Sequence, residues 1–310
     1  MRSQIHRTVG LMFVAMLALS FTGSARNMTV PAKGQDAKVK SMKTINANAW
    51  KIYTTNWGSF VMPVSGSGGF WGGPGYSYIY GAGMWVGATD AGGTPHVALG
   101  YYPNNGSSEM GPVNPFTGDW INWASDQAAR TYLSTDPTDL AEWPLKDAQG
   151  GNLIKSVQDG YAVYSDENPA FTFTGETKVG VRIRQHSYAW NYADNNDIVF
   201  FYFRVINVSG HTLNGVYIGP CFDADVGNER IGNDLTDFDY TRNMAIQFQT
   251  ESEPGYPKIG YFGCRYFESP VNNTGKTINI IDNEFPHPIA PGDPLGMTAF
   301  KLFTIDIDPP

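Results

Sequence analysis

Apolar and polar residues alternate with a period of two over several stretches of this chain. Residues 178–190 place Val179, Val181 and Ile183 on one side and Lys178, Arg182 and Arg184 on the other. A period of two is typical of a β-strand with one buried face. Ser77–Ala88 shows the same alternation, and His96–Tyr102 is its expected partner strand across the turn-forming residues 90–93.

Residues 198–208 form a nearly unbroken apolar run, which predicts a central strand covered on both faces. Further strands are expected at 170–174, 213–222, 244–249, 258–267, 277–281 and 298–306. Short strands separated by turn residues favour a mainly β fold, an antiparallel β-sandwich with long loops. It is expected to cover residues 45–310, as one region or as two subdomains that meet near residue 150.

Short helical insertions are expected between the strands. Asp136 followed by Pro137 is typical of an N-cap and a first helical position, which predicts a helix over Pro137–Trp143. A second helix is expected over Ser125–Leu133.

The first 25 residues have the pattern of a secretory signal peptide. Arg2, His6 and Arg7 precede an apolar run of about 13 residues, shorter than the roughly 20 of a membrane span. Small residues follow at Gly23 and Ala25, where a signal peptidase would cleave. The sequence therefore predicts a secreted or outer-surface protein with no transmembrane segment, the alternative being an uncleaved membrane anchor or a buried helix. Residues 26–44 are expected to form a polar linker.

The other end of the chain predicts a continuation. Residues 298–306 read as a covered strand, and Asp308-Pro309-Pro310 is turn chemistry that usually joins one strand to the next. We therefore expect the natural protein to extend beyond Pro310.

Composition narrows the classes of partner. Aromatic residues make up 14% and charged residues 16% of the chain, with 35 Gly and 20 Pro, which favours sheet and turns. The net charge of −8 argues against nucleic acid as a partner. The only cysteines, Cys221 and Cys264, are expected either to form a disulfide or to remain separate buried thiols.

The densest polar segment lies between two expected strands and is rich in carboxylates. Crowded hard oxygen ligands suit calcium, which takes six to eight oxygens. The alternative is a solvated loop whose side chains bond to turn backbone groups. The proposed ligands are Asp223, Asp225, Asp234, Asp237 and Asp239.

Motifs of nucleophilic, zinc-dependent or phosphate-binding enzymes are missing from the sequence. Seven tryptophans are candidates for a sugar-stacking face, although core packing explains them as well. They are Trp57, Trp71, Trp85, Trp120, Trp123, Trp143 and Trp190.

Several segments together resemble a bacterial family. Residues 57–60, 80–87, 100–104 and 108–109 occur in an order similar to the N-terminal region of large secreted proteins of Bacteroidota, and 223–243 resembles a second recurring stretch. The resemblance implies surface proteins associated with type IX secretion, whose biochemical role is not established. Such proteins often carry a C-terminal sorting domain, which the residues up to Pro310 do not include.

These observations favour a non-catalytic extracellular or cell-surface module, structural or binding a carbohydrate or protein ligand and stabilised by calcium. The alternative is an accessory domain of a secreted hydrolase that acts on polysaccharide or protein.

Calcium is expected to raise the melting temperature, and a chelator to reverse the change. A ligand that binds only the native state adds about 2.7 kcal/mol at a hundredfold excess over its Kd. Asp225→Ala should remove most of this shift in differential scanning calorimetry. Identical melting curves with calcium and with chelator would count against the site.

Overall fold

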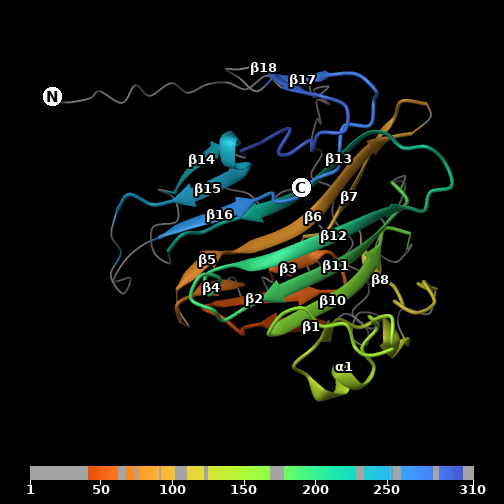
Figure 1. Ribbon diagram of the computed structural model, residues 1–310, viewed down its shortest axis with the longest axis vertical. Helices are drawn as coiled ribbons and strands as arrows, with labels where there is room; N and C mark the ends of the chain where they lie inside the picture. Colours follow the sequence, from red (N-terminus) through yellow and green to blue (C-terminus); the bar gives the residue numbers. More distant parts are fainter. Residues whose placement is uncertain are drawn as a thin grey trace, which may run out of the picture. The chain divides into compact units, whose positions relative to one another are not determined.

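The computed structural model describes residues 41–61, 68–73, 76–90, 92–101, 110–121, 125–167, 178–227, 234–251, 253, 260–281 and 286–302. They form two compact units (Figure 1). The larger unit holds the described residues up to 227 together with 251 and 253, and the smaller unit holds 234–250 and 260–302. Residue 150 lies within the larger unit. The predicted signal peptide lies outside the described residues.

The larger unit consists of antiparallel sheets. The first sheet has the order β1 (Met42–Ile45), β2 (Trp50–Thr55), β4 (Gly69–Trp71), β5 (Ser77–Ile79). The second has the order β13 (Asn214–Asp223), β6 (Gly81–Thr89), β3 (Ser59–Val61), with β7 (Pro95–Leu99) also on β6. The third has the order β12 (Val199–Asn207), β11 (Val181–Ala189), β10 (Gln158–Ser165), β8 (Gly111–Pro112), with β9 (Tyr132–Leu133) also on β10.

The smaller unit has one three-stranded sheet and one hairpin. The sheet has the order β14 (Leu235–Asp239), β15 (Met244–Phe248), β16 (Tyr261–Arg265), and the hairpin pairs β17 (Ile278–Ile281) with β18 (Pro286–Ile289). Asn243 adopts a φ of 51° in the turn before β15, and its side chain accepts a hydrogen bond from the Met297 N–H at 3.0 Å. This bond fixes residues 296–297 against the sheet.

The third sheet of the larger unit buries one face against β2 and β3. Along β11 every second residue is buried, as its alternation predicts. On β3, the Phe60 ring lies 5.1 Å from Phe201 and 5.7 Å from Phe203 on β12. Deeper in the interface, buried Gln185 donates to the Thr54 hydroxyl at 2.7 Å and accepts from the Tyr164 hydroxyl at 2.9 Å. The third sheet is thus joined to β2 and β3 by packed aromatic rings and by the hydrogen bonds that Gln185 forms with Thr54 and Tyr164.

Three glycines allow three backbone segments to meet. A Cβ on Gly83 would lie 1.3 Å from the Gly100 carbonyl oxygen, and one on Gly100 would lie 2.8 Å from the Gly58 Cα. The Gly58 carbonyl accepts the Met84 N–H at 3.0 Å, and the Gly100 N–H donates to the Met84 carbonyl at 2.9 Å. The backbone at Gly58, Gly83 and Gly100 therefore converges at a crossing that only glycine fits.

Helix α1 (Pro137–Ala141) confirms the prediction of a helix starting at Pro137, with the Asp136 carboxylate accepting the Thr138 N–H at 2.9 Å. The helix expected over Ser125–Leu133 is wrong. That segment has a 3₁₀ turn at Gln127–Ala129 and then strand β9, which pairs with β10. None of the described helices is long and apolar enough to span a membrane.

Most expected strands are present, with three differences. The first described strand begins at Met42, inside the stretch expected as linker. Residues 198–208 do form a strand, but β12 lies at the edge of its sheet and its Tyr202 side chain is 47% exposed, so the prediction of a doubly covered central strand is wrong. Residues 298–302 form no strand. The strand expected at 170–174 and residues 303–306 lie outside the described residues.

Each unit contains one cysteine, and both are free thiols. Cys221 lies on β13 of the larger unit and Cys264 on β16 of the smaller unit. Burial raises the pKa of each thiol to about 12. Of the two alternatives for the cysteines, the structure has the separate thiols.

Gly83→Ala should lower the free energy of unfolding by about 3 kcal/mol, because the new methyl group meets backbone that cannot move aside. Gly87→Ala on the same strand is the matched control, since its Cβ would have 3.8 Å to the nearest atom. We expect that variant to stay within about 0.5 kcal/mol of the parent in urea unfolding. Equal losses in both variants would contradict the crossing.

Candidate ligand-binding face

The five aspartates proposed as calcium ligands are divided between the two units. Asp223 ends β13 of the larger unit, where its carboxylate accepts the Tyr101 hydroxyl at 2.9 Å, and Asp225 follows it. Asp234, Asp237 and Asp239 belong to the smaller unit.

Contacts within the smaller unit already engage its acidic side chains. Asp234 accepts the Gln247 amide at 3.0 Å, and Asp239 bonds to Thr241 and Arg242, which lower the pKa of Asp239 to about 2. In the part of the chain that the structure describes, no group of three or more His, Cys, Asp or Glu is placed to hold a metal. Residues 228–233 lie outside that part, and calcium binding stays a prediction.

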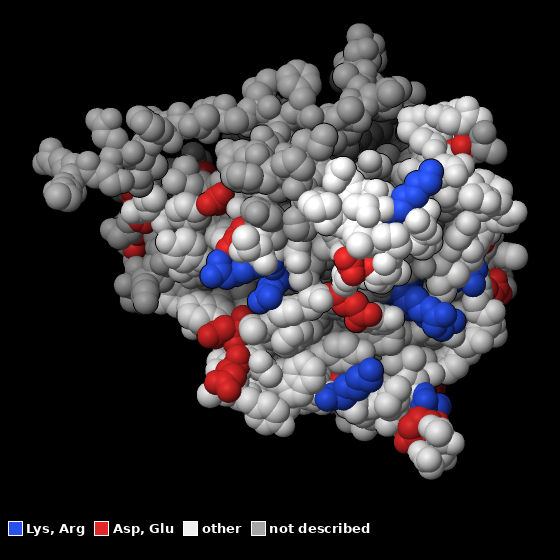
Figure 2. All heavy atoms as spheres, turned by 45° about the horizontal axis from the view of Figure 1, so that its top comes forward, with Lys and Arg blue, Asp and Glu red and all other residues white. Residues whose placement is uncertain are grey.

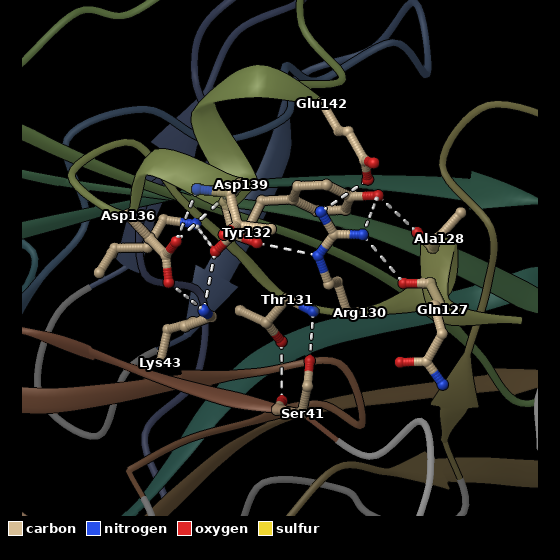
Figure 3. Close-up of polar contacts among 12 residues, drawn as sticks. Ser41, Lys43, Gln127, Ala128, Arg130, Thr131, Tyr132, Asp136, Asp139 and Glu142 are labelled. Atoms are coloured by element: carbon tan, nitrogen blue, oxygen red, sulfur yellow. Dashed lines mark hydrogen bonds and ion pairs between the residues drawn. The ribbon is translucent and has the colours of Figure 1, made fainter.

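The most connected set of charged residues lies where α1 meets β1 (Figure 3). Asp139 is 1% exposed, and its carboxylate lies 2.9 Å from Lys43 Nζ and 2.8 Å from Arg130 Nε. The same carboxylate accepts the Leu133 N–H at 3.0 Å. Arg130 also pairs with Glu142 at 2.9 Å. Because its charges satisfy one another, we interpret this network as a fastening of residues 130–142 to β1.

The outer face of the third sheet has a different character, since it carries aromatic rings in cross-strand register. Tyr161, His186 and Tyr202 lie opposite one another on β10, β11 and β12, which Figure 1 shows side by side. The His186 ring lies 4.8 Å from Tyr161 and 5.5 Å from Tyr202.

The rings continue toward the turn between β11 and β12. Tyr188 stacks 6.1 Å from His186, Trp190 lies 6.1 Å from Tyr188, and Phe200 lies 5.5 Å from Trp190. We call these six residues the ring row: Tyr161, His186, Tyr202, Tyr188, Trp190 and Phe200.

The segment between β8 and β10 covers one end of the ring row. Val113, Tyr132 and Trp143 form a buried cluster with Tyr161 and Val163 of β10. Tyr161 is consequently only 2% exposed, whereas Tyr202 on β12 is open to solvent. The ring row is therefore covered by this cluster at Tyr161 on β10 and reaches solvent at Tyr202 on β12.

The turn at the far end of the ring row is held in place by two indoles. Trp50 donates to the Asp197 carbonyl at 2.8 Å and Trp71 to the Asp197 carboxylate at 2.9 Å. Asn48 adds a bond to the Ile198 carbonyl at 2.8 Å. This turn carries Trp190 at its start, so the contacts preorganise the row.

The rings are uncharged at neutral pH. Burial, with Lys155 and Arg184 nearby, lowers the pKa of His186 to about 4, so its imidazole is neutral. Burial raises the pKa of Tyr161, and that of Tyr188 to about 12. Positive charge beside the rings comes instead from Lys155, whose Nζ lies 5.9 Å from the Tyr188 ring, and from arginines on the same face.

Sequence reasoning named only Trp190 from this surface. Of the other candidate tryptophans, Trp57 and Trp143 are buried, while Trp71, Trp85 and Trp120 are partly buried and do not join the ring row. Trp123 lies outside the described residues. The missed signal is the aromatic share of 198–208, where Phe200 and Tyr202 face outward.

No protein-family model, curated protein or solved structure matches the chain.

Acidification should destabilise the fold through His186. Its folded pKa lies below the unfolded value, so the unfolded chain binds the extra proton as pH falls from about 6.5 to 4, and stability is lost across that window. The loss should be about 2–3 kcal/mol. In urea unfolding at several pH values, His186→Phe should reduce this slope and His211→Phe, at an exposed site, should not. An unchanged slope in His186→Phe would refute the assignment.

Proposed function

We propose that the chain is a non-catalytic extracytoplasmic module that binds polysaccharide on the ring row. The observation that carries the proposal is the alignment of six rings, packed within 4.8–6.1 Å of one another, along a face that opens to solvent at Tyr202. A contiguous apolar surface that reaches solvent often marks an interaction site. Sugar rings present flat C–H faces that pack on aromatic faces.

The architecture supports a rigid display of these rings. With one face of the third sheet packed on β2 and β3, we propose an antiparallel β-sandwich for the larger unit, with the ring row on its outer surface. A strand scaffold positions side chains more precisely than a loop does, which lowers the entropic cost of binding.

The buried aspartates of the larger unit support binding over catalysis. Asp159 accepts the Lys155 and Ser156 N–H groups at 2.8 Å, and Asp166 accepts the Val181 N–H at 2.7 Å. Asp139 is paired with two cations as described above. Each carboxylate has a structural role, whereas hydrolysis requires a carboxyl pair directed at a shared substrate bond.

The expected export signal and the resemblance to secreted bacterial proteins agree with an extracytoplasmic glycan ligand. Both remain predictions from the sequence. Calcium is proposed as a stabilising ion and is not part of the ring row.

Removing rings of the ring row should weaken polysaccharide binding. We expect Trp190→Ala and Tyr202→Ala each to reduce affinity about tenfold, equivalent to about 1.4 kcal/mol, in affinity electrophoresis against a panel of soluble polysaccharides. Tyr217→Ala on β13 is the matched control, because Tyr217 is 60% exposed but is not in the ring row. The proposal fails if no polysaccharide retards the parent protein, or if all three variants bind alike.

A further inference from the structure

Two arginines on the outer face of the third sheet lie directly opposite each other. Arg184 on β11 pairs in register with Arg204 on β12. Like charges at directly opposed positions of an antiparallel pair repel and destabilise the sheet. Departures from the rules that stabilise a sheet, such as this repulsion between like charges, are expected at functional sites.

Neither Arg184 nor Arg204 forms an ion pair with another described residue, whereas Arg130, Arg182 and Arg242 each do. Arg182, two residues earlier on β11, pairs with Glu167 at 2.8 Å, and Arg130 pairs with Asp139. Figure 2 shows acidic and basic side chains in small groups of both signs on the face it displays. Arg184 and Arg204 instead have another guanidinium group as their direct neighbour on the same rung of the sheet.

The opposed pair adjoins the ring row. Arg184 and Arg204 each lie two residues along their strands from His186 and Tyr202, which places them on the same face about 6.4–6.8 Å away. Val163 of β10 lies opposite Arg184 and is buried in the same cluster as Tyr161. His186, Tyr202 and the two arginines thus lie on one face of the sheet, beside this buried cluster.

We propose that the ligand is an acidic polysaccharide, whose carboxylate or sulfate group is bound between Arg184 and Arg204 while its sugar rings stack on the ring row. This inference rests on the proposed function. Each guanidinium presents a planar fork of N–H donors that matches the oxygens of such an anion. The anion would remove the repulsion between the two arginines on binding.

A nucleic acid also offers anions and flat rings, but the charge of the chain disfavours it. A net charge of −8 repels a continuous polyanion, and the positive groups that the described residues place beside the rings without an ion pair are few, namely Arg184, Arg204 and Lys155. A glycan with spaced anionic groups suits this small positive area better.

The test measures binding of the full chain to hyaluronan, κ-carrageenan, neutral dextran and a single-stranded DNA oligonucleotide. Arg184→Gln and Arg204→Gln should each weaken binding to an acidic glycan at least tenfold and reduce its dependence on NaCl. The first two probes distinguish carboxylate from sulfate. Arg265→Gln in the smaller unit is the control for the change of net charge, and it should bind like the parent.

Melting temperatures of the same variants give an independent reading. Loss of the opposed charges should leave the melting temperature unchanged or raised, so weaker binding would not reflect unfolding. Equal binding of neutral and acidic glycans would overturn the inference and leave the proposed function standing. Binding to none of the glycans would overturn both. Tighter binding to the oligonucleotide than to either acidic glycan would replace the glycan with a nucleic acid.

Discussion

The backbone crossing at Gly58, Gly83 and Gly100 is the constraint on which the larger unit depends. It brings the end of β7 and the segment before β3 onto β6 at distances that leave no room for a side chain. Tyr101, the residue after Gly100, can then lie over Gly81 and reach Asp223 at the end of β13. Since the crossing also places β3, it directs Phe60 at β12 and so determines how the sheets pack.

This packing separates the two faces of the third sheet into different roles. The inner face is closed by rings and by the polar chain through Gln185, both of which are satisfied within the protein. The outer face is only half closed, because the segment between β8 and β10 ends its cover at β10. On β12 this face includes the exposed Tyr202 and Arg204, and Arg204 lies opposite the partly buried Arg184 of β11. Binding sites commonly depart from the rules that stabilise the rest of a fold.

The sequence predicted local structure well and its assembly poorly. The period of two over 178–190 correctly separated the buried and outward residues of β11, and Asp136-Pro137 correctly located α1. The apolar run at 198–208 predicted a central strand, but β12 lies at the edge of its sheet, because hydrophobicity alone does not tell which strands lie beside it. The opposition of Arg184 and Arg204 follows from strand register, and register is not visible in a single strand. The acidic segment predicts one site because its residues are near in sequence; the two units share these residues, and calcium binding stays a prediction.

The two free thiols give each unit its own reporter of opening. A thiol with a pKa near 12 contains almost no thiolate at neutral pH, whereas an exposed cysteine has a pKa near 8.5 and reacts with alkylating reagents. Modification of Cys221 therefore follows the opening of β13, and modification of Cys264 follows that of β16. With one thiol in each unit, the two labelling rates reveal whether the units unfold together or one after the other.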